Sequence, residues 1–217
     1  MSIFSFGKEN YNAFRIISRP PSMKDLKEKT DGQLVALTLR DREAFGHLVK
    51  RYEKKLKRYV QRLTGLDAAS AEDVLQEAFI KIYLNLNDYD PDFSFSAWAY
   101  RITHNEAINH LRKNKINTVP LESDDEETVN LIEILKSETD VAREASRKDL
   151  IERIQKAIGL LPEKYREVLI LRYTEDMSYE EISDILRMPM GTVAVTINRA
   201  KEKFRQIAEK MHLNPRK

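Results

Sequence analysis

Small, amide and cationic side chains follow one another near the C-terminus, in a pattern that suits contact with a DNA duplex. The segment SYEEISDILRMPMGTVAVTINRAKEKFRQ predicts a short helix from Ser178, a turn at residues 187–190 and a long helix from Thr192. Apolar side chains of the long helix share one face, and its small, amide and basic side chains point away. Such a helix can place its first turns at base edges and its cations near phosphates. The residues assigned to this contact are Ser178, Thr192, Ala194, Val195, Asn198, Arg199, Lys201 and Arg205. An ordinary helical hairpin is the alternative interpretation.

Carboxylates alternate with aliphatic side chains on one face of an earlier predicted helix, within SAEDVLQEAFIKIYLNL. The face holds Asp73, Gln76, Glu77, Ile80 and Leu84, and it lies nearly opposite the apolar stripe of the same helix. A solvated face does not usually mix acids with Ile and Leu, so we expect it to meet a partner that carries basic and apolar groups. The alternative is that the N-terminal segment covers the two aliphatic residues.

Aromatic and cationic side chains are interleaved on the next predicted helix, within DFSFSAWAYRITHNEAINHLRKNK. Rings can stack on exposed bases while cations neutralise phosphates, so this pattern favours a single strand of nucleic acid. The residues in question are Trp98, Tyr100, Arg101, His104, Asn105, Arg112 and Lys113. For the tryptophan alone, burial in a core is the commoner role.

The histidines of the same helix do not predict a metal centre. His104 and His110 are six residues apart and so lie about 120° from one another around the helix. A metal-dependent hydrolase using these two residues and Glu106 is therefore a weak alternative. We expect no catalytic residue, no metal ligand and no cofactor.

The composition predicts a helical protein of the cytoplasm. The 217 residues include no Cys, only 6 Gly and 7 Pro, and no apolar run of the length that a membrane span needs. The N-terminus MSIFSFGKENYNAF lacks a basic start followed by an apolar stretch, so we expect neither a secretory signal nor membrane insertion.

The net charge of +2 hides three blocks of different sign. Residues 1–116 carry 20 basic and 15 acidic side chains, residues 117–150 carry 4 and 10, and residues 151–217 carry 13 and 10. The middle block predicts a solvated acidic linker with at most a short helix at Leu131–Lys136. We therefore expect an all-α protein with two small helical domains, at 31–116 and 146–212, an acidic linker at 117–145 and an N-terminal extension at 1–30.

Helical periodicity fills both domains. The first is expected to contain four helices and the second a helix-turn-helix, with Ser178 and Glu181 forming a capping box and Pro162 in a first helical turn. The expected helices are Asp31–Leu39, Arg42–Leu63, Ala69–Leu86, Ser96–Asn114, Ser146–Gly159, Pro162–Tyr173, Ser178–Leu186 and Thr192–Lys210.

Two separate segments resemble the sigma-70 superfamily of bacterial RNA polymerase sigma factors, in particular the small extracytoplasmic-function (ECF) group. AEDVLQEAFIKIYLNL with FSFSAWAYRITHNEAINHLRK resembles region 2, and LPEKYREVLILRYTEDMSYEEISDILRMPMGTVAVTINRAKEKF resembles region 4. They stand in the family's order and, with the preceding DREAFGHLVKRYEKKLKRYVQRLTG, cover most of residues 31–210. Relatives often have Gly at the position of Arg187 and more basic and polar residues after Gly-Thr-Val.

The resemblance implies a role for each segment. Asp73, Gln76 and Glu77 match the motif that contacts core polymerase, and Ile80 is assigned to the same contact. The segment from Leu84 to Phe95 matches the loop that captures a flipped base of the minus-ten element, and the helix after it matches the one that follows the melted strand. The residues assigned to the minus-ten element are Asn85, Asn87, Asp88, Tyr89, Trp98, Arg101, Asn105, Arg112 and Lys113. The helix-turn-helix would bind the minus-thirty-five element.

The resemblance thus predicts a transcription initiation factor that directs core polymerase to promoters and helps to melt them. Expected partners are core RNA polymerase, promoter DNA as duplex and melted strand, and an inhibitory anti-sigma protein. A helix-turn-helix regulator that binds duplex DNA alone as a dimer is the main alternative. Promoter sequence, inducing signal and the role of residues 1–30 cannot be read from the sequence.

Overall fold

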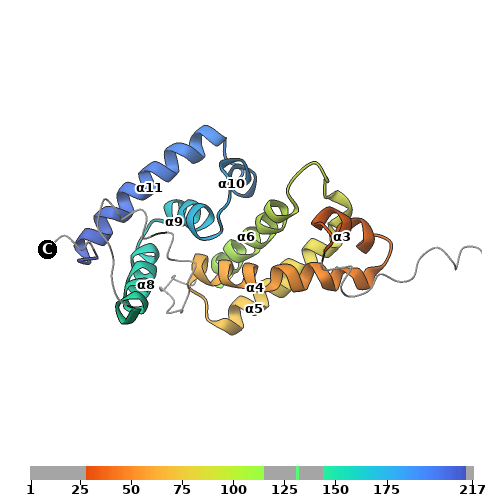
Figure 1. Cartoon of the computed structure of the whole chain (residues 1–217), viewed down its shortest axis with the longest axis horizontal. Helices are drawn as coiled ribbons and strands as arrows, with labels where there is room; N and C mark the ends of the chain where they lie inside the picture. Colours follow the sequence, from red (N-terminus) through yellow and green to blue (C-terminus); the bar gives the residue numbers. More distant parts are fainter. Residues whose placement is uncertain (1–27, 115–130, 132–143, 214–217) are drawn as a thin grey trace, which may run out of the picture. The chain divides into compact units, whose positions relative to one another are not determined.

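The computed structural model describes residues 28–114, 131 and 144–213 and divides the chain into two compact units, 1–48 and 49–217. The described residues form helices and contain no strand, which confirms the all-α prediction (Figure 1). The expected helix at Leu131–Lys136 lies outside the described residues, apart from Leu131 itself. Within the described part of the chain, no helix is long and apolar enough to span a bilayer.

The first unit contains helix α3 (Asp31–Thr38), the 3₁₀ turn η1 (Arg42–Ala44) and the start of α4 (Phe45–Thr64). Thr30 begins α3 with a capping box, in which its Oγ1 accepts from Gln33 N and Gln33 Oε1 accepts from Thr30 N. Asp41 caps η1 in a similar way, through the backbone N–H of Glu43. Short polar caps of this kind satisfy donors that a helix start leaves without a partner.

The second unit begins with the rest of α4, followed by α5 (Ala68–Leu84), the 3₁₀ turn η2 (Leu86–Asp88) and α6 (Phe95–Asn114). The buried side chains of α4 recur at helical spacing and form its inner face: Tyr52, Leu56, Tyr59, Val60 and Leu63. Gly65 has φ 69° and follows α4 directly, and a residue without Cβ enters this left-handed conformation without strain. Helix α5 ends at Leu84, two residues before the end of the expected helix Ala69–Leu86. Leu86 is buried in η2.

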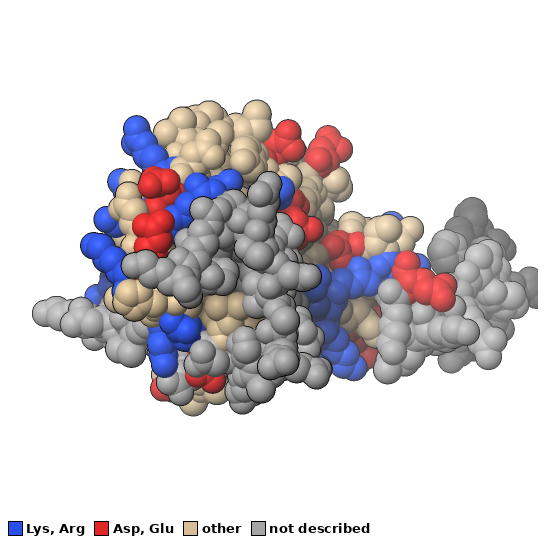
Figure 2. Space-filling view, turned by 60° about the vertical axis from the view of Figure 1, so that its left-hand side comes forward, with Lys and Arg blue, Asp and Glu red and all other residues tan. Residues whose placement is uncertain are grey.

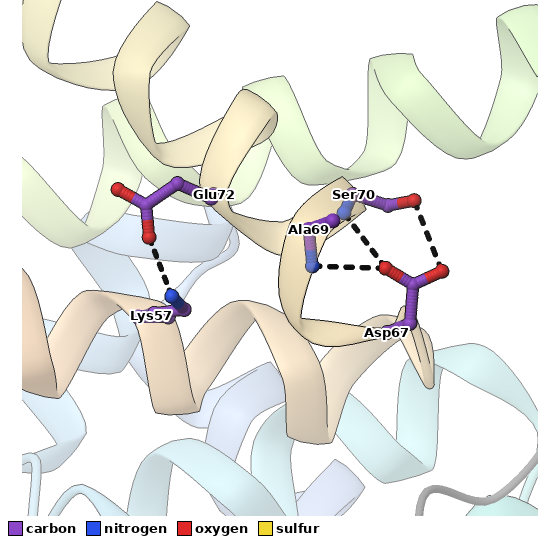
Figure 3. Close-up of polar contacts among 5 residues, drawn as sticks. All are labelled: Lys57, Asp67, Ala69, Ser70 and Glu72. Carbon is purple, nitrogen blue, oxygen red and sulfur yellow. Dashed lines mark hydrogen bonds and ion pairs between the residues drawn. The ribbon is translucent and has the colours of Figure 1, made fainter.

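Asp67 fixes the start of α5. Its Oδ1 accepts from the backbone N–H groups of Ala69 and Ser70, both at 2.9 Å (Figure 3). These bonds stabilise the ionised carboxylate and, led by the bond from Ser70, lower the pKa of Asp67. One turn further on, Glu72 pairs with Lys57 of α4 (Figure 3). The cap and the ion pair together fix where α5 starts beside α4.

The helix-turn-helix half comprises α8 (Glu144–Gly159), α9 (Glu163–Leu169), the π-helical turn η4 (Ile170–Thr174), α10 (Tyr179–Leu186) and α11 (Met190–Lys210). Helix α11 packs against α8, α9 and α10. Its buried face consists of Val193, Ile197, Ala200, Phe204 and Ala208. The expected capping box at Ser178 is confirmed, since Ser178 Oγ accepts from Glu181 N and Glu181 Oε2 accepts from Ser178 N.

Several expected boundaries in this half are wrong, including the starts of α8 and α10, which lie at Glu144 and Tyr179. Pro162 is the N-cap of α9 and not its first helical residue, and the expected single helix Pro162–Tyr173 widens into a π-turn after Leu169. Helix α11 starts at Met190, two residues before the expected start, because Pro189 serves as its N-cap. Pro lacks an N–H and so suits a helix start, but periodicity alone does not say at which of the flanking positions it will lie.

Arg187 ends α10 in a left-handed conformation, with φ 50° and ψ 46°. Ser183 holds the turn, because its carbonyl accepts from Met188 N at 3.1 Å and its Oγ donates to Met188 O at 2.7 Å. For an L-residue with a Cβ, this conformation costs about 1–2 kcal/mol. The turn therefore forms without the glycine that favours it.

We expect Arg187→Gly to raise the free energy of unfolding by about 0.5–1 kcal/mol, because glycine removes the strain and loses part of that gain to the greater freedom of its unfolded chain. Urea denaturation at pH 7 measures the change. Arg187→Ala keeps a Cβ at the same position and serves as the control, with no gain expected. A less stable glycine variant would show that the arginine side chain itself holds the turn.

Candidate functional site

The acid-and-aliphatic face of α5 is exposed. Asp73, Gln76 and Glu77 are exposed, and Ile80 and Leu84 remain 52% and 68% exposed although both are large and apolar. The alternative, that the N-terminal segment covers the two aliphatic residues, concerns residues 1–27, which lie outside the described residues. The opposite side of α5 packs on α6 and buries Val74, Leu75, Ala78 and Ile82. We call Asp73, Gln76, Glu77, Ile80 and Leu84 the docking face.

The minus-ten candidates differ in exposure, and two of them, Tyr89 and Arg101, are half-buried. Asn85, Asn87, Asp88, Asn105, Arg112 and Lys113 are exposed on or near η2 and α6. Trp98, in contrast, is only 7% exposed and packs with Tyr89 and Phe95 at ring-centroid distances of 5.6 and 5.7 Å. The ring of Trp98 is therefore packed against the aromatic residues of the loop, in the core role that is commoner for tryptophan. It is not exposed enough to stack on a base.

Two details of the loop before α6 were not predicted. Phe93 is 64% exposed, while its carbonyl accepts from Tyr89 Oη at 2.8 Å. Ser94 caps α6, because its Oγ accepts from Ala97 N at 3.3 Å. An aromatic residue inside the polar turn NDYDPDFS was the available signal for Phe93, since such a ring is seldom left in water without a use.

The outer face of α11 is open to a duplex. Thr192, Val195, Asn198, Arg199 and Arg205 are exposed, whereas Ala194 and Lys201 are half-buried. Ser178 is half-buried as well and acts as the cap of α10, so its hydroxyl is already engaged with the backbone. The exposed methyl groups of Val195 can contact a thymine methyl, and the amide and the cations beside it suit base edges and phosphates.

A polar seam joins the first helices of the second unit to its helix-turn-helix half. Arg62 Nη1 and Tyr100 Oη each donate to Glu175, at 2.6 and 2.5 Å, and the side chains of Arg62 and Glu175 are only 7% and 4% exposed. A separate ion pair joins Arg101 Nη1 to Asp184 Oδ1 at 2.6 Å. A further hydrogen bond joins Ser94 to Glu181 and is described in the next paragraph. We call these seven residues, Arg62, Ser94, Tyr100, Arg101, Glu175, Glu181 and Asp184, the polar seam.

The π-turn positions the central carboxylate of this seam. Glu175 N donates to Ile170 O at 3.0 Å, five residues back, and Met177 N donates to Leu171 O at 2.9 Å. The widened turn sends the chain away from α9 and leaves Glu175 directed at α4 and α6. Glu181 has two roles, because its Oε2 completes the capping box while its Oε1 accepts from Ser94 Oγ at 3.1 Å. Sequence reasoning predicted the capping box at Ser178 and missed the other contacts.

A second buried polar group lies beside the seam. His104 Nδ1 is 2.9 Å from Tyr59 Oη, and His104 Nε2 is 3.6 Å from Glu167 Oε1 of α9. Burial lowers the pKa of His104 to about 4, with the nearby Arg112 adding to the effect. Burial likewise raises the pKa of Glu167 to about 7, helped by Glu163. Both groups are thus neutral over a window between these values.

The hydrolase alternative finds no support in this geometry. His104 is directed at Tyr59 and Glu167, and Glu106 pairs with Lys81 of α5 at 2.6 Å. Among the residues with described positions, no three His, Asp or Glu side chains gather in a way that would hold a metal ion. These side chains act in packing and in pairing between helices.

We expect Glu167 to lower the free energy of unfolding as the pH rises from about 4.5 to 7. Its pKa is raised from 4.5 unfolded to about 7 folded, so its contribution is complete below pH 4.5 and is lost once the pH has risen through 7. The full loss corresponds to about 3 kcal/mol. His104 acts in the opposite direction between pH 4 and 6.5, so the two effects nearly cancel and wild-type stability should change little between pH 4.5 and 6.5. Urea denaturation of Glu167→Gln should therefore show a free energy of unfolding that rises from pH 4.5 to 6.5. A variant as insensitive to pH as wild type would contradict this role of Glu167.

Two family models match this chain in the order that the helices suggest. The model for Sigma-70 region 2 matches residues 48–116, which include the docking face and the loop before α6. The model for Sigma-70, region 4 matches residues 151–204, which include the helix-turn-helix. The fold and the exposed faces thus define a two-part helical protein of the sigma-70 class.

Curated relatives refine the class. The chain is 34% identical to the ECF RNA polymerase sigma factor SigW of Bacillus subtilis over 76% of its own length and 89% of the relative's. It is 37% identical to the RNA polymerase sigma-H factor of Pseudomonas aeruginosa, over 82% and 93%, and 34% identical to the ECF RNA polymerase sigma-E factor of Escherichia coli K12, over 75% and 85%. This chain belongs to the ECF RNA polymerase sigma factors.

Solved structures agree with the fold. CnrH, solved in complex with the cytosolic domain of CnrY, is 25% identical, with a TM-score of 0.61, and the match covers 84% of this chain and 99% of CnrH. The sigma factor RpoE of Bartonella quintana, in complex with the anti-sigma factor NepR, is 19% identical, with a TM-score of 0.56, over 76% and 96%. The second likeness supports the helical fold alone.

Proposed function

We propose that this chain binds core RNA polymerase, directs it to promoters and helps to melt them, without catalysing a reaction itself. The observation that carries the proposal is the docking face of α5, whose acidic and aliphatic side chains are exposed within the segment that matches region 2. Polymerase supplies the catalytic site, and this protein supplies binding energy that favours melted over duplex DNA. Such a factor acts in the cytoplasm, where polymerase meets DNA.

Each part of the chain has a proposed role. Residues 31–116 bind core polymerase and the minus-ten element, residues 146–212 bind the minus-thirty-five element, and residues 117–145 link the two. Flipping a base out of the stack costs a few kcal/mol. Contacts with the loop before α6 offset that cost only for a base that fits them. Exposed Phe93 joins the predicted minus-ten residues as a side chain on which a base can stack.

The surface charge predicts that the free protein binds DNA weakly. On the face shown in Figure 2, basic and acidic side chains lie interspersed, in keeping with a net charge of +2. A surface of this kind neutralises few phosphates. Specific promoter binding therefore requires the polymerase complex. CnrH, a structural relative, was solved in complex with the cytosolic domain of CnrY, which supports the proposal that a protein partner, here the expected anti-sigma protein, binds this chain.

Transcription from fragmented genomic DNA of the source organism tests the proposal. Core polymerase with the full chain should produce transcripts whose 5′ ends share a minus-ten and a minus-thirty-five element, and core polymerase alone should not. Gln76→Ala should reduce these transcripts about tenfold if Gln76 is a central contact, whereas Gln206→Ala, at an exposed site on α11, should leave docking intact. Identical transcripts with and without the chain would refute the proposal.

Binding of palindromic DNA by a dimer, unaffected by Gln76→Ala, would instead support a regulator that acts alone.

A further inference from the structure

The hydrogen bonds of the polar seam run in one direction. The donors belong to α4, α6 and the residue before α6, and the acceptors are carboxylates of α10 and of the residue after η4. The donors are Arg62, Ser94, Tyr100 and Arg101, and the acceptors are Glu175, Glu181 and Asp184. An interface that only had to hold two helical surfaces together would not require this one-sided arrangement.

One donor, Arg101, lies where a melted strand is proposed to bind, and two others are its neighbours on or beside α6. Arg101 is one of the residues assigned to the minus-ten element, while Ser94, the cap of α6, and Tyr100, within α6, flank buried Trp98 in the sequence. A phosphate and a carboxylate offer the same chemistry to a guanidinium or a hydroxyl, namely anionic oxygens that accept short hydrogen bonds. A strand that contacts Arg101 must therefore displace Asp184.

We propose that Glu175, Glu181 and Asp184 act as an internal mimic of DNA phosphates, so that the helix-turn-helix half blocks the strand-binding side of α6 in the free protein. The inference rests on the proposed function, because it assumes that α6 binds the melted strand. Polymerase, by holding the two halves of the protein on separate promoter elements, would release the carboxylates and expose the donors. The proposed weak DNA binding of the free chain would then have a structural cause beyond its low net charge.

Within the polar seam, Glu175 is expected to contribute most to holding the two halves together. Its carboxylate and the guanidinium of Arg62 are both nearly excluded from water in the closed arrangement, whereas Arg101 and Asp184 are 24% and 35% exposed. Truncating one partner of a buried charge pair leaves the other charge without compensation. In the open arrangement water solvates Arg62, so loss of Glu175 should disfavour closure without a matching effect on the open form. The strand affinity seen in solution is the intrinsic affinity multiplied by the open fraction, so opening raises it.

The test uses the full chain with two seam substitutions, Glu175→Gln and Asp184→Asn. The probe is a fluorescein-labelled single-stranded DNA of 12 nucleotides and mixed sequence, followed by anisotropy. We expect this variant to bind at least about tenfold more tightly than wild type. The matched control, Glu180→Gln with Glu209→Gln, removes two exposed carboxylates from α10 and α11 and so raises the net charge equally. It should bind like wild type within about twofold, since each distant surface charge has a small effect.

A second readout reports opening directly. The sequence contains no Cys, so Glu53→Cys on α4 and Lys203→Cys on α11 place a fluorescent donor and acceptor at two exposed sites. Energy transfer should fall in the seam variant and stay constant in the control. Tighter binding that the control variant matches would overturn the inference, and so would a loss of energy transfer with no gain in strand affinity. Failure of the proposed function would appear elsewhere, as a wild-type chain that gives no transcripts with core polymerase.

Discussion

Reversing both carboxylates of the docking face, by Asp73→Lys with Glu77→Lys, is expected to lower promoter-directed transcription by at least about a hundredfold. Both side chains are exposed, so the substitution leaves the core of α5 untouched. The loss follows because two like charges would now face the basic groups that we expect on polymerase. Transcription with purified core polymerase, at fixed concentrations of both proteins, measures the effect, and thermal unfolding followed by circular dichroism checks that the helices persist.

The control is a chain with the same change in net charge at other exposed sites, Glu53→Lys with Glu209→Lys. It should retain most of the wild-type activity, because neither residue lies on the docking face. If the two double variants lost activity equally, total charge and not the docking face would explain the result. If Asp73→Lys with Glu77→Lys transcribed like wild type, α5 would not be the contact with polymerase.

Val195→Glu is expected to reduce transcription from a promoter with a minus-thirty-five element by about ten- to a hundredfold, while polymerase binding is unchanged. Val195 is 49% exposed on the outer face of α11, so glutamate can be accommodated without entering the core. The carboxylate would lie among phosphates and replace an apolar contact, and both effects oppose binding. Band-shift assays with the polymerase complex, on promoters with and without the upstream element, separate recognition from docking.

Gln206→Glu supplies the matched control for charge. It adds one carboxylate to the same helix, eleven residues and roughly 16 Å further along, where base edges are out of reach. We expect a loss of less than about threefold, from the general effect of one negative charge near DNA. Equal losses in the two variants would indicate that α11 contributes charge alone and does not contact bases at Val195.

Local signals in the sequence predicted most of the helices. Ser178 with Glu181 forms a capping box, and the box appears in the structure with both hydrogen bonds. Helical periodicity also separated the two faces of α5 correctly, because residues three and four apart must share an environment. The exposed state of Ile80 and Leu84 then agrees with a docking role that the periodicity alone had suggested.

Contacts between distant segments could not be predicted in the same way. Glu175 stands in the polar sequence YTEDMS and resembles a loop residue in water, yet its side chain is 4% exposed because Arg62, 113 residues away, lies against it. Nothing near Glu175 in sequence encodes that partner. The π-turn after Leu169 was not predicted either, and the Glu175 that follows it bonds to side chains of α4 and α6.

Trp98 shows a different limit of prediction from sequence. Its position among cations suggested contact with bases, whereas tertiary packing encloses its ring between Tyr89 and Phe95. Arg187 gives the converse case, because the missing glycine was visible in the sequence and the structure shows that the left-handed turn forms nevertheless. Residue type alone identified both as special positions, and only the fold decided what each one does.

Equilibrium association of the fluorescently labelled full chain with purified core RNA polymerase tests the proposed docking most directly. A saturable one-to-one complex is predicted for wild type, with affinity lowered at least tenfold by Ile80→Ala, which removes the central apolar side chain of the docking face. Absence of a complex with the wild-type chain, or equal affinity for wild type and Ile80→Ala, would contradict it.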